Sequence, residues 1–226
     1  HCISSAASDV YKRQGLFEAR QAIREAGYAL VTEGYMDVVA LAQLGFPQAV
    51  ATLGTACTPI HVQKLLRQTD QVIFSFDGDK AGRRAARRAL EASLPHAGDN
   101  KVIKFLFLPS EHDPDSYIRE LGSEAFEKQV QDAMPLSQFL LKEAVGDNDL
   151  GTPEGRARAQ FDAKPLLQAL PPSSLRLQIV RSLAQITEST PAEIEAVFEL
   201  SQPISHVRAP PPVSYTHLRA HETRED

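Results

Sequence analysis

Short apolar runs alternate with helical patterns between residues 28 and 117, and this alternation limits the possible folds more than any other feature. The runs predict strands at residues 28–31, 49–52, 72–76 and 102–108, and the segments between them predict helices at residues 35–44, from Thr58 onward and at residues 80–93. Strands connected by helices of this length run parallel, and the helices cover both faces of the sheet. The sequence therefore predicts an α/β fold with a parallel sheet.

The pattern changes after Asp113, where no further strand is expected. Helices are predicted at residues 123–133, 135–145, 153–170, 173–185 and 191–200. We therefore expect an α/β domain over residues 15–120 and a helical bundle over residues 121–202.

The two ends are not expected to belong to the fold. Residues 1–14 (HCISSAASDVYKRQ) and 214–226 (SYTHLRAHETRED) have neither helical nor strand periodicity, and they resemble the conceptual translation of sequencing-library adapters. A proline run at residues 210–212 is typical of a linker. We interpret residues 1–14 as an artefactual tail, residues 203–226 as a linker followed by an artefactual tail, and the remainder as a piece of a longer chain.

Composition excludes several classes of protein. No apolar run approaches the roughly 20 residues that span a bilayer, so no membrane partner is expected. The first residues lack the apolar centre of a signal peptide, and Cys57 is the only cysteine outside the tails, which suits the reducing cytoplasm. The formal net charge of −5 argues against nucleic-acid binding by bulk charge, so a polyanionic partner requires a local basic patch or metal ions.

Acidic residues follow three of the four predicted strands. Glu33 follows the first strand, Asp77 and Asp79 follow the third, and Asp113 and Asp115 follow the fourth. Sites in open parallel sheets lie beyond the carboxyl ends of the strands, so these carboxylates are expected to converge on one edge. Such a cluster is costly unless cations neutralise it, and hard oxygen ligands select Mg²⁺ or Mn²⁺, which act together with phosphates.

Simpler interpretations of the same carboxylates stay open. Asp77-Gly78-Asp79 and Asp113-Pro114-Asp115 also fit turns that lead into helix N-caps, and Glu33 fits a solvated turn. A calcium loop is excluded, because Ala81 and Arg88 occupy positions that need ligands. The sequence contains no Walker A loop, no G-x-G-x-x-G and no G-x-S-x-G. A P-loop protein, a dinucleotide-binding protein and a hydrolase with a nucleophile elbow therefore have no support from sequence motifs.

A basic helix is predicted directly after Asp79. Spacings of three and four residues place Arg83, Arg84, Arg87 and Arg88 on one face, whereas Ala81, Gly82, Ala85, Ala86, Ala89 and Leu90 are expected to pack on the sheet. A solvated basic face is the simpler interpretation. Its position beside the carboxylates favours contact with phosphates or nucleic acid, for which Lys80, Arg83 and Arg84 are the candidates. Cys57, His61 and His112 are not expected to be catalytic.

Several segments resemble the family of bacterial DnaG-type DNA primases. They are VTEGYMDVV at residues 31–39, ATLGT at 51–55, FDGDKAG at 76–82, FLP at 107–109, DPD at 113–115, AMPLS at 133–137 and TPEGRA at 152–157. They occur in the family's order over nearly all of residues 15–200. The resemblance implies a TOPRIM fold, which is a Rossmann-like parallel sheet with helices on both faces, followed by the helical part of the primase polymerase domain.

The resemblance also implies a chemistry. Glu33, Asp77 and Asp79 would be the principal acidic residues, Asp113 and Asp115 would complete the metal site, and Asp37 would support it. The implied reaction is synthesis of short RNA primers on a single-stranded DNA template from ribonucleoside triphosphates. Two or more Mg²⁺ or Mn²⁺ ions would activate the primer 3′-hydroxyl and stabilise the pyrophosphate leaving group.

Other parts of the family's pattern are not expected in this chain. Zinc is expected only in a missing N-terminal domain, and the basic first part of the polymerase domain is expected to be missing too. The replicative helicase is expected to bind a missing C-terminal domain beyond the proline run. The isolated fragment is therefore expected to be weakly active or inactive.

Two competing functions remain open at this point. A TOPRIM nuclease or topoisomerase shares the implied fold, but a topoisomerase needs a cleavage tyrosine in a separate domain, whereas Tyr28, Tyr35 and Tyr117 lie in or near the predicted sheet. A catalytically incomplete module that binds metal or nucleotide is the other alternative. The sequence also leaves open whether Glu33 acts as a ligand or as a proton acceptor.

Overall fold

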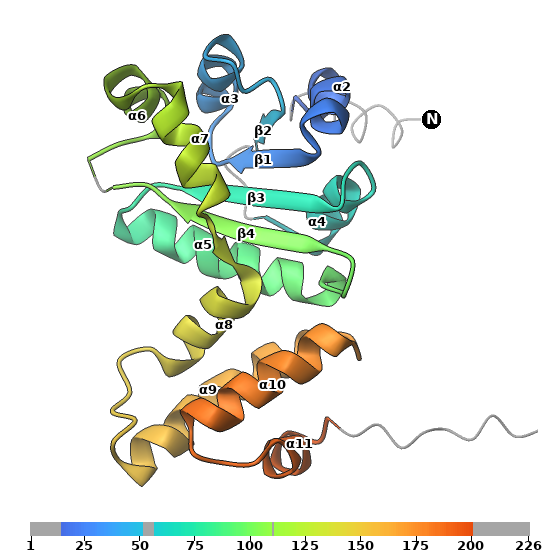
Figure 1. The fold of residues 1–226 in the computed structure, drawn as a ribbon, viewed down its shortest axis with the longest axis vertical. Coiled ribbons are helices and arrows are strands. Elements are labelled where there is room, and N and C mark those ends of the chain that lie inside the picture. The colour runs from blue at the N-terminus through green and yellow to red at the C-terminus, as the bar shows by residue number, and fades with distance from the viewer. Residues whose placement is uncertain (1–14, 52–56, 110, 201–226) are drawn as a thin grey trace, which may run out of the picture.

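The computed structural model describes residues 15–51, 57–109 and 111–200 (Figure 1). Both predicted tails, the proline linker and residues 52–55 of the quoted resemblance lie outside the described residues.

The sheet has five strands in the order β2-β1-β3-β4-β5. The first four, which are parallel, are β1 (Tyr28–Thr32), β2 (Ala49–Ala51), β3 (Gln71–Phe76) and β4 (Val102–Phe107). The fifth, β5 (Met134–Pro135), pairs antiparallel with β4 through Phe105 opposite Met134. The predicted parallel sheet is therefore confirmed, with one short antiparallel strand added at its edge.

Alternate residues of the strands pack into two separate cores, one on each face of the sheet. Leu30, Ile73 and Leu106 pack with α3 (Tyr35–Gln43), α6 (Pro114–Leu121) and α7 (Ser123–Gln131). Val31, Phe74 and Phe105 face the opposite core, against α2 (Leu16–Ala26), α4 (Pro59–Leu66) and α5 (Lys80–Ser93). In Figure 1, α7 and α5 lie across the strands of the sheet, and α2 and α3 lie near β1 and β2. Alternation of this kind is what a sheet buried on both faces requires.

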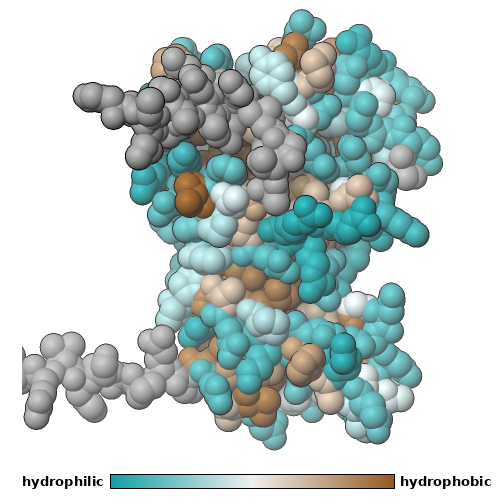
Figure 2. Space-filling model, turned by 180° about the vertical axis from the view of Figure 1, so that it is seen from behind, coloured by the Kyte–Doolittle hydropathy of each residue, from teal (hydrophilic) through white to brown (hydrophobic). Residues whose placement is uncertain are grey.

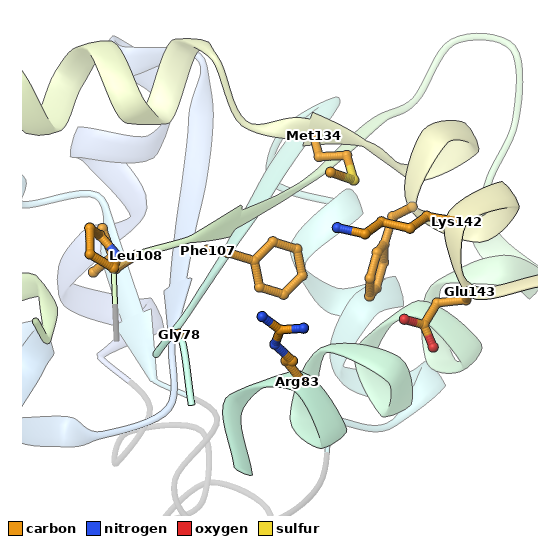
Figure 3. A pocket seen from close by; sticks show the side chains of 9 residues that line it. Gly78, Arg83, Phe107, Leu108, Met134, Lys142 and Glu143 are labelled. Carbon is orange, nitrogen blue, oxygen red and sulfur yellow. The ribbon is translucent and has the colours of Figure 1, made fainter. Parts of the chain in front are cut away.

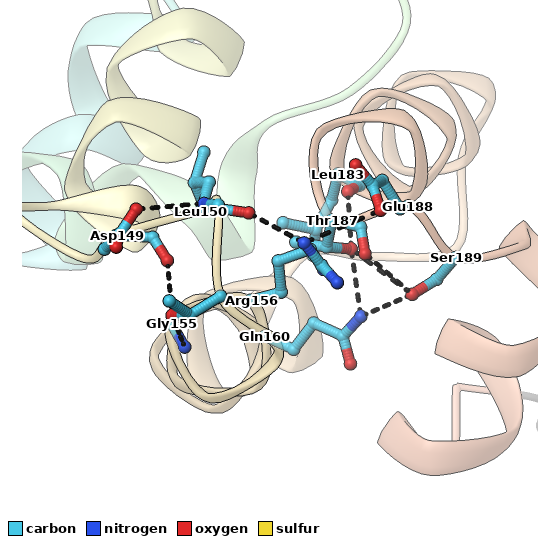
Figure 4. A network of polar contacts seen from close by, with 11 residues as sticks. Asp149, Leu150, Gly155, Arg156, Gln160, Leu183, Thr187, Glu188 and Ser189 are labelled. Atoms are coloured by element: carbon cyan, nitrogen blue, oxygen red, sulfur yellow. Dashed lines mark hydrogen bonds and ion pairs between the residues drawn. The ribbon is translucent and has the colours of Figure 1, made fainter.

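The C-terminal part is a bundle of helices below the sheet in Figure 1. It consists of α8 (Leu136–Val145), α9 (Pro153–Ala169), α10 (Ser174–Ile186) and α11 (Pro191–Phe198). A polar network ties α9 to the turn after α10 (Figure 4): Gln160 Nε2 donates to Thr187 Oγ1 and Ser189 Oγ at 2.9 and 2.7 Å. Within the described residues, none of the helices combines the length and apolar character that crossing a membrane would require.

The bundle joins the sheet domain through a shared apolar core, in which the rings of Phe105 and Phe139 lie 4.7 Å apart, and through polar contacts at two places among the described residues. The Asp99 carboxylate, in the turn before β4, accepts hydrogen bonds from the backbone N–H groups of Ser174 and Leu175 at the start of α10. Arg87 on α5 lies 3.2 Å from Glu143 on α8. In the surface view of Figure 2, apolar residues gather at the narrowing between the two parts, while most of the remaining described surface is hydrophilic.

Three elements differ from the sequence-based expectation. The expectation of no strand after Asp113 is wrong, because β5 follows α7 and pairs with β4. The helices α2 and α6 were not predicted, although both contribute to the cores. In addition, α7 and β5 pack with the sheet although they follow residue 120. We therefore propose that the sheet domain extends to Pro135.

Candidate functional site

Six carboxylates lie at or after the carboxyl ends of β1, β3 and β4, and we call this group the acidic edge; its members are Glu33, Asp37, Asp77, Asp79, Asp113 and Asp115. Glu33 directly follows β1, and Gly34 then begins α3 as its N-cap. The backbone N–H of Gly34 donates to Asp37 Oδ2 at 3.1 Å. This hydrogen bond fixes Asp37 beside the end of β1.

Glu33 carries the clearest sign of an unsatisfied site. Its Oε1 atom is buried and accepts no hydrogen bond within the described part of the chain. Burial raises the pKa of Glu33, and the negative charges of Asp77 and Asp79 raise it further. A buried carboxylate oxygen without a donor is costly, so this atom is suited to a partner that carries positive charge.

Asp77 and Asp37 belong to the same electrostatic group. Loss of surrounding water raises the pKa of Asp77, and the charges of Asp37, Asp79 and Asp113 add to the effect. Burial also raises the pKa of Asp37, with further increases from Asp113 and Asp115 and a reduction from its hydrogen bond with Gly34. These charge effects place carboxylates from all three strand ends near one another, while a shared metal site stays a prediction.

Two of the aspartates also serve as helix N-caps. Asp79 Oδ1 accepts from the backbone N–H of Gly82 at 2.7 Å at the start of α5, and Asp113 Oδ1 accepts from that of Ser116 at 2.7 Å at the start of α6. The hydrogen bond from Ser116 lowers the pKa of Asp113. The N-cap interpretation is therefore correct for both, and each retains a second oxygen that the cap does not use.

Asp115 is already engaged in an ion pair. Its Oδ1 atom lies 2.8 Å from Nε of Arg119, one helical turn further along α6. Both side chains are partly exposed, so this pair adds little to stability and is open to exchange with another cation.

A close backbone approach shapes the turn between Asp77 and α5. A Cβ atom placed on Gly82 would lie 2.1 Å from the backbone oxygen of Asp77. Only glycine permits this contact, which folds the start of α5 back onto the end of β3. The turn thereby holds Asp77 and Asp79 at the sheet edge.

The donor set fits a hard divalent cation, although the described residues form no ready-made metal cage. Among residues 15–51, 57–109 and 111–200, no three His, Cys, Asp or Glu side chains are arranged to hold an ion. The available donors are carboxylate oxygens, which Mg²⁺ and Mn²⁺ prefer, and one of them is the orphaned Oε1 of Glu33. Mg²⁺ commonly binds through one or two carboxylates, water and substrate phosphates, so a closed protein cage is not required.

Among the basic side chains of α5, Arg87 forms ion pairs, whereas others form none with the described residues. Lys80, Arg83, Arg84, Arg87 and Arg88 are all exposed. Arg87 lies 3.3 Å from Glu91 and 3.2 Å from Glu143, so it holds α5 to α8. The side chains of Lys80, Arg83 and Arg84 form no ion pair with the described residues. The expected packing face is largely correct, except that Ala81 is exposed and Ala85 only half-buried.

The structure also reveals a cavity that sequence reasoning missed (Figure 3). It adjoins the acidic edge at Gly78, and its wall includes Phe107 from the end of β4 together with Phe139 and Lys142 from α8. These residues come from segments that only the folded chain brings together, and no local pattern marks them. The one available signal is that Arg83, already a candidate from sequence, also lines the cavity.

The surroundings of Cys57 and His112, which lie outside the acidic edge, suit a structural role. Burial raises the pKa of the half-buried Cys57 thiol to about 12, which disfavours a nucleophilic thiolate. The His112 ring packs edge-on against Tyr117 at 5.6 Å between centroids.

Two protein-family models match the chain. A model described as Toprim-like matches residues 30–118, and a model described as the DnaB-helicase binding domain of primase matches residues 137–190. The first covers the sheet with its acidic edge. The second covers most of α8, α9 and α10. The family resemblance, by contrast, implies helicase contact only beyond the proline run.

Curated proteins and solved structures that match the chain are also DNA primases. The DNA primase of Escherichia coli K12 is 46% identical over 185 residues, which are 80% of this chain and 32% of that protein. A DNA primase domain from Pseudomonas aeruginosa superposes with a TM-score of 0.77 at 43% identity, covering 82% of this chain and 58% of that one. A DnaG primase catalytic domain bound to ssDNA gives a TM-score of 0.75 at 46% identity, covering 79% and 57%. The chain thus spans about a third of the curated relative, and the expected fold is confirmed.

Proposed function

The chain belongs to the bacterial DnaG-type DNA primases, of which it spans part of the catalytic core, and from this premise we propose that its acidic edge binds the divalent cations for primer synthesis. The observation that carries this proposal is Glu33, whose buried Oε1 atom lacks a donor while neighbouring carboxylates raise its pKa. Two or more Mg²⁺ or Mn²⁺ ions would activate the primer 3′-hydroxyl and stabilise the departing pyrophosphate.

The roles of the carboxylates follow from their surroundings. Glu33, Asp77 and Asp79 hold the cations, since Glu33 has an unused buried oxygen and Asp79 is oriented by its hydrogen bond with Gly82. Asp113 and Asp115 complete the site from α6. Asp37 supports it from α3, where the Gly34 hydrogen bond fixes its orientation.

The basic start of α5 supplies the contacts to phosphate. Lys80, Arg83 and Arg84 are exposed and directly follow Asp79, so they bind the triphosphate of a ribonucleotide or the backbone of the single-stranded DNA template. The DnaG catalytic domain that was solved with ssDNA supports the template as a partner.

The parent protein acts at the bacterial replication fork in the cytoplasm and engages the replicative helicase. The family model for helicase binding over residues 137–190 supports this partner and suggests that α8 to α10 contribute to the contact. Zinc belongs to a separate domain of the parent protein. The comparisons do not favour a nuclease or topoisomerase, because the named relatives are DNA primases.

Primer synthesis by a chimera tests this function. Residues 15–200 replace the matching segment of the Pseudomonas aeruginosa DNA primase, and RNA primers are measured on single-stranded DNA with Mg²⁺ and ribonucleotides. The chimera is expected to make primers. Asp77→Asn in the chimera lowers the rate by at least about 100-fold, because metal ions contribute several kcal/mol to such reactions.

Asp147→Asn is the matched control, since Asp147 is exposed in the loop after α8. It should leave the rate unchanged. Equal primer synthesis by the Asp77→Asn chimera and the parent chimera would refute the proposed role of the acidic edge.

A further inference from the structure

The cavity beside the acidic edge has the size and lining of a ligand site. Its volume is about 380 Å³, which lies within the range of roughly 300–1,000 Å³ that small-molecule pockets occupy. The lining combines residues from the start of α5, the end of β4, β5 and α8. It therefore exists only because the bundle packs against the sheet domain at this point.

One wall of the cavity is aromatic and apolar. The rings of Phe107 and Phe139 lie 5.2 Å apart at 57° between planes, and Met134 lies beside them. Phe139 is buried, whereas Phe107 is only half-buried and is turned toward the open space in Figure 3. A half-buried ring next to a thioether offers a stacking surface for a planar heteroaromatic group.

Two cations complete the opposite side. Arg83 from α5 and Lys142 from α8 both point toward the Phe107 ring in Figure 3. Neither side chain forms an ion pair with any residue that the structure describes. Glu143 also lines the cavity, but its Oε2 atom is engaged by Arg87 at 3.2 Å. The cavity thus presents two cations without an ion-pair partner among the described residues beside an aromatic surface, a combination that suits a planar ligand with negative charge.

We propose that this cavity binds one unpaired nucleotide unit, with its base against Phe107 and its phosphate between Arg83 and Lys142. The inference rests on the proposed function, which brings nucleotides and single-stranded DNA to this edge. The base of an incoming nucleotide must pair with the template, so its edge cannot be enclosed in a side cavity. The occupant is therefore an unpaired unit, from either a free nucleotide or the single strand, and Gly78 places it directly beside Asp77 and Asp79.

The two methionines of the chain allow a direct test of location. Met134 lines the cavity, while Met36 is 75% exposed on α3 and serves as an internal reference. With ¹³C-methyl-labelled methionine in the full chain and no divalent cation, dTMP is expected to shift the Met134 signal and leave the Met36 signal in place. Thymidine or inorganic phosphate alone should bind at least about tenfold more weakly, because each lacks one of the two contacts.

Variants separate the base contact from the phosphate contact. Phe107→Leu keeps an apolar side chain but removes the ring, and it should weaken dTMP binding by about tenfold, the scale of one lost base–aromatic stack. Lys142→Gln, on the exposed side of α8, should weaken dTMP binding but not thymidine binding. Lys128→Gln on α7 is the matched control, because Lys128 is exposed and does not line the cavity. Because Lys142 is exposed, its variant tests the proposal even if Phe107→Leu fails to fold.

The affinities of dTMP and of a thymidylate decamer show whether the bound nucleotide unit comes from a free nucleotide or from single-stranded DNA. Tighter binding of the decamer through the same Met134 shift would identify the single strand as the source, and equal or weaker binding would identify the free nucleotide. No Met134 shift with either probe would overturn the proposal. Inorganic phosphate binding as tightly as dTMP, or dTMP binding to both variants as tightly as to the parent chain, would overturn it too.

The metal proposal is tested separately, by Mn²⁺ binding to the same proteins. Asp77→Asn is expected to lose Mn²⁺ binding and to keep the Met134 shift with dTMP. Retained Mn²⁺ binding in Asp77→Asn would refute the proposed function and would leave the proposal of a nucleotide cavity unaffected. Loss of Mn²⁺ binding without any Met134 shift in the parent chain would refute the cavity alone.

Discussion

The Asp79 carboxylate accepts a hydrogen bond of 2.7 Å from the backbone N–H of Gly82. This contact gives Asp79 two roles, because one oxygen caps α5 while the other remains available at the acidic edge. The same residue therefore links the stability of the basic helix to the proposed cation site.

Substitution of Asp79 separates these roles. Asn also caps helices, so Asp79→Asn should change the free energy of unfolding little, whereas Asp79→Ala should reduce it by about 1 kcal/mol. Both variants should weaken Mn²⁺ binding, since both remove the charge. Urea unfolding together with calorimetry measures the two effects. Equal destabilisation by Asn and Ala would show that the cap does not stabilise α5.

Gly82→Ala tests the close approach of α5 to Asp77. The added methyl group meets the Asp77 backbone oxygen at 2.1 Å, so the turn must shift. We expect a loss of about 1–3 kcal/mol in the free energy of unfolding, typical of overpacking, together with weaker Mn²⁺ binding. Ala81→Ser at the exposed neighbouring position should change stability by less than about 0.5 kcal/mol. A fully stable Gly82→Ala protein with unchanged Mn²⁺ affinity would contradict the account.

The raised pKa of Asp77 predicts a pH-dependent effect of its removal. A carboxyl whose pKa is higher in the folded state binds protons more strongly there, so its ionisation destabilises the fold. This cost is absent below the pKa of the unfolded chain and complete above that of the folded protein. Without divalent cations, Asp77→Asn should have the same free energy of unfolding as the parent chain at about pH 3 and a higher one at about pH 7.

Asp113→Asn should show the opposite sign. The Ser116 hydrogen bond lowers the pKa of Asp113, so its ionisation stabilises the fold above the unfolded pKa, and this contribution is lost as the pH falls through the folded value. The variant should therefore be less stable than the parent chain near about pH 7 and equal to it at low pH. Chemical unfolding across this pH range measures both variants. Parallel pH profiles for the two would contradict the assigned electrostatics.

The Arg87–Glu143 pair predicts a measurable coupling between α5 and α8. Its side chains are 51% and 26% exposed, so a double-mutant cycle with Arg87→Gln and Glu143→Gln should give about 0.2–1 kcal/mol, reduced by salt. The cycle with Arg84→Gln is the control and should give no coupling energy. Zero coupling in the first cycle would show that Arg87 does not hold the two elements together.

The sequence predicts the sheet well because its signals there are local. Lys80–Ser93 is predicted with the bounds that the structure shows, since Asp79 caps it and small residues alternate with arginines in a helical period. The strands are recognised by their apolar runs. The convergence of Glu33, Asp77 and Asp113 follows because parallel strands end at one edge.

The missed features depend on contacts between distant segments. The strand β5 has only two residues, one of them proline, and exists because Met134 pairs with Phe105 across the chain. The cavity similarly requires α8 with Lys142 and β4 with Phe107 to meet, because both residues line it. The helix α6 has eight residues, too few for a strong periodic signal, and only its N-cap at Asp113 is recognisable in the sequence.

Calorimetric titration of the full chain with Mn²⁺ tests the central claim most directly. The parent chain and the Asp147→Asn control should bind Mn²⁺ with micromolar to millimolar affinity, and the Asp77→Asn/Asp79→Asn double variant should lose this binding. Loss in the double variant alone would place the cation at the end of β3, as the proposed function requires. Equal binding in all three proteins, or no binding in the parent chain, would contradict it.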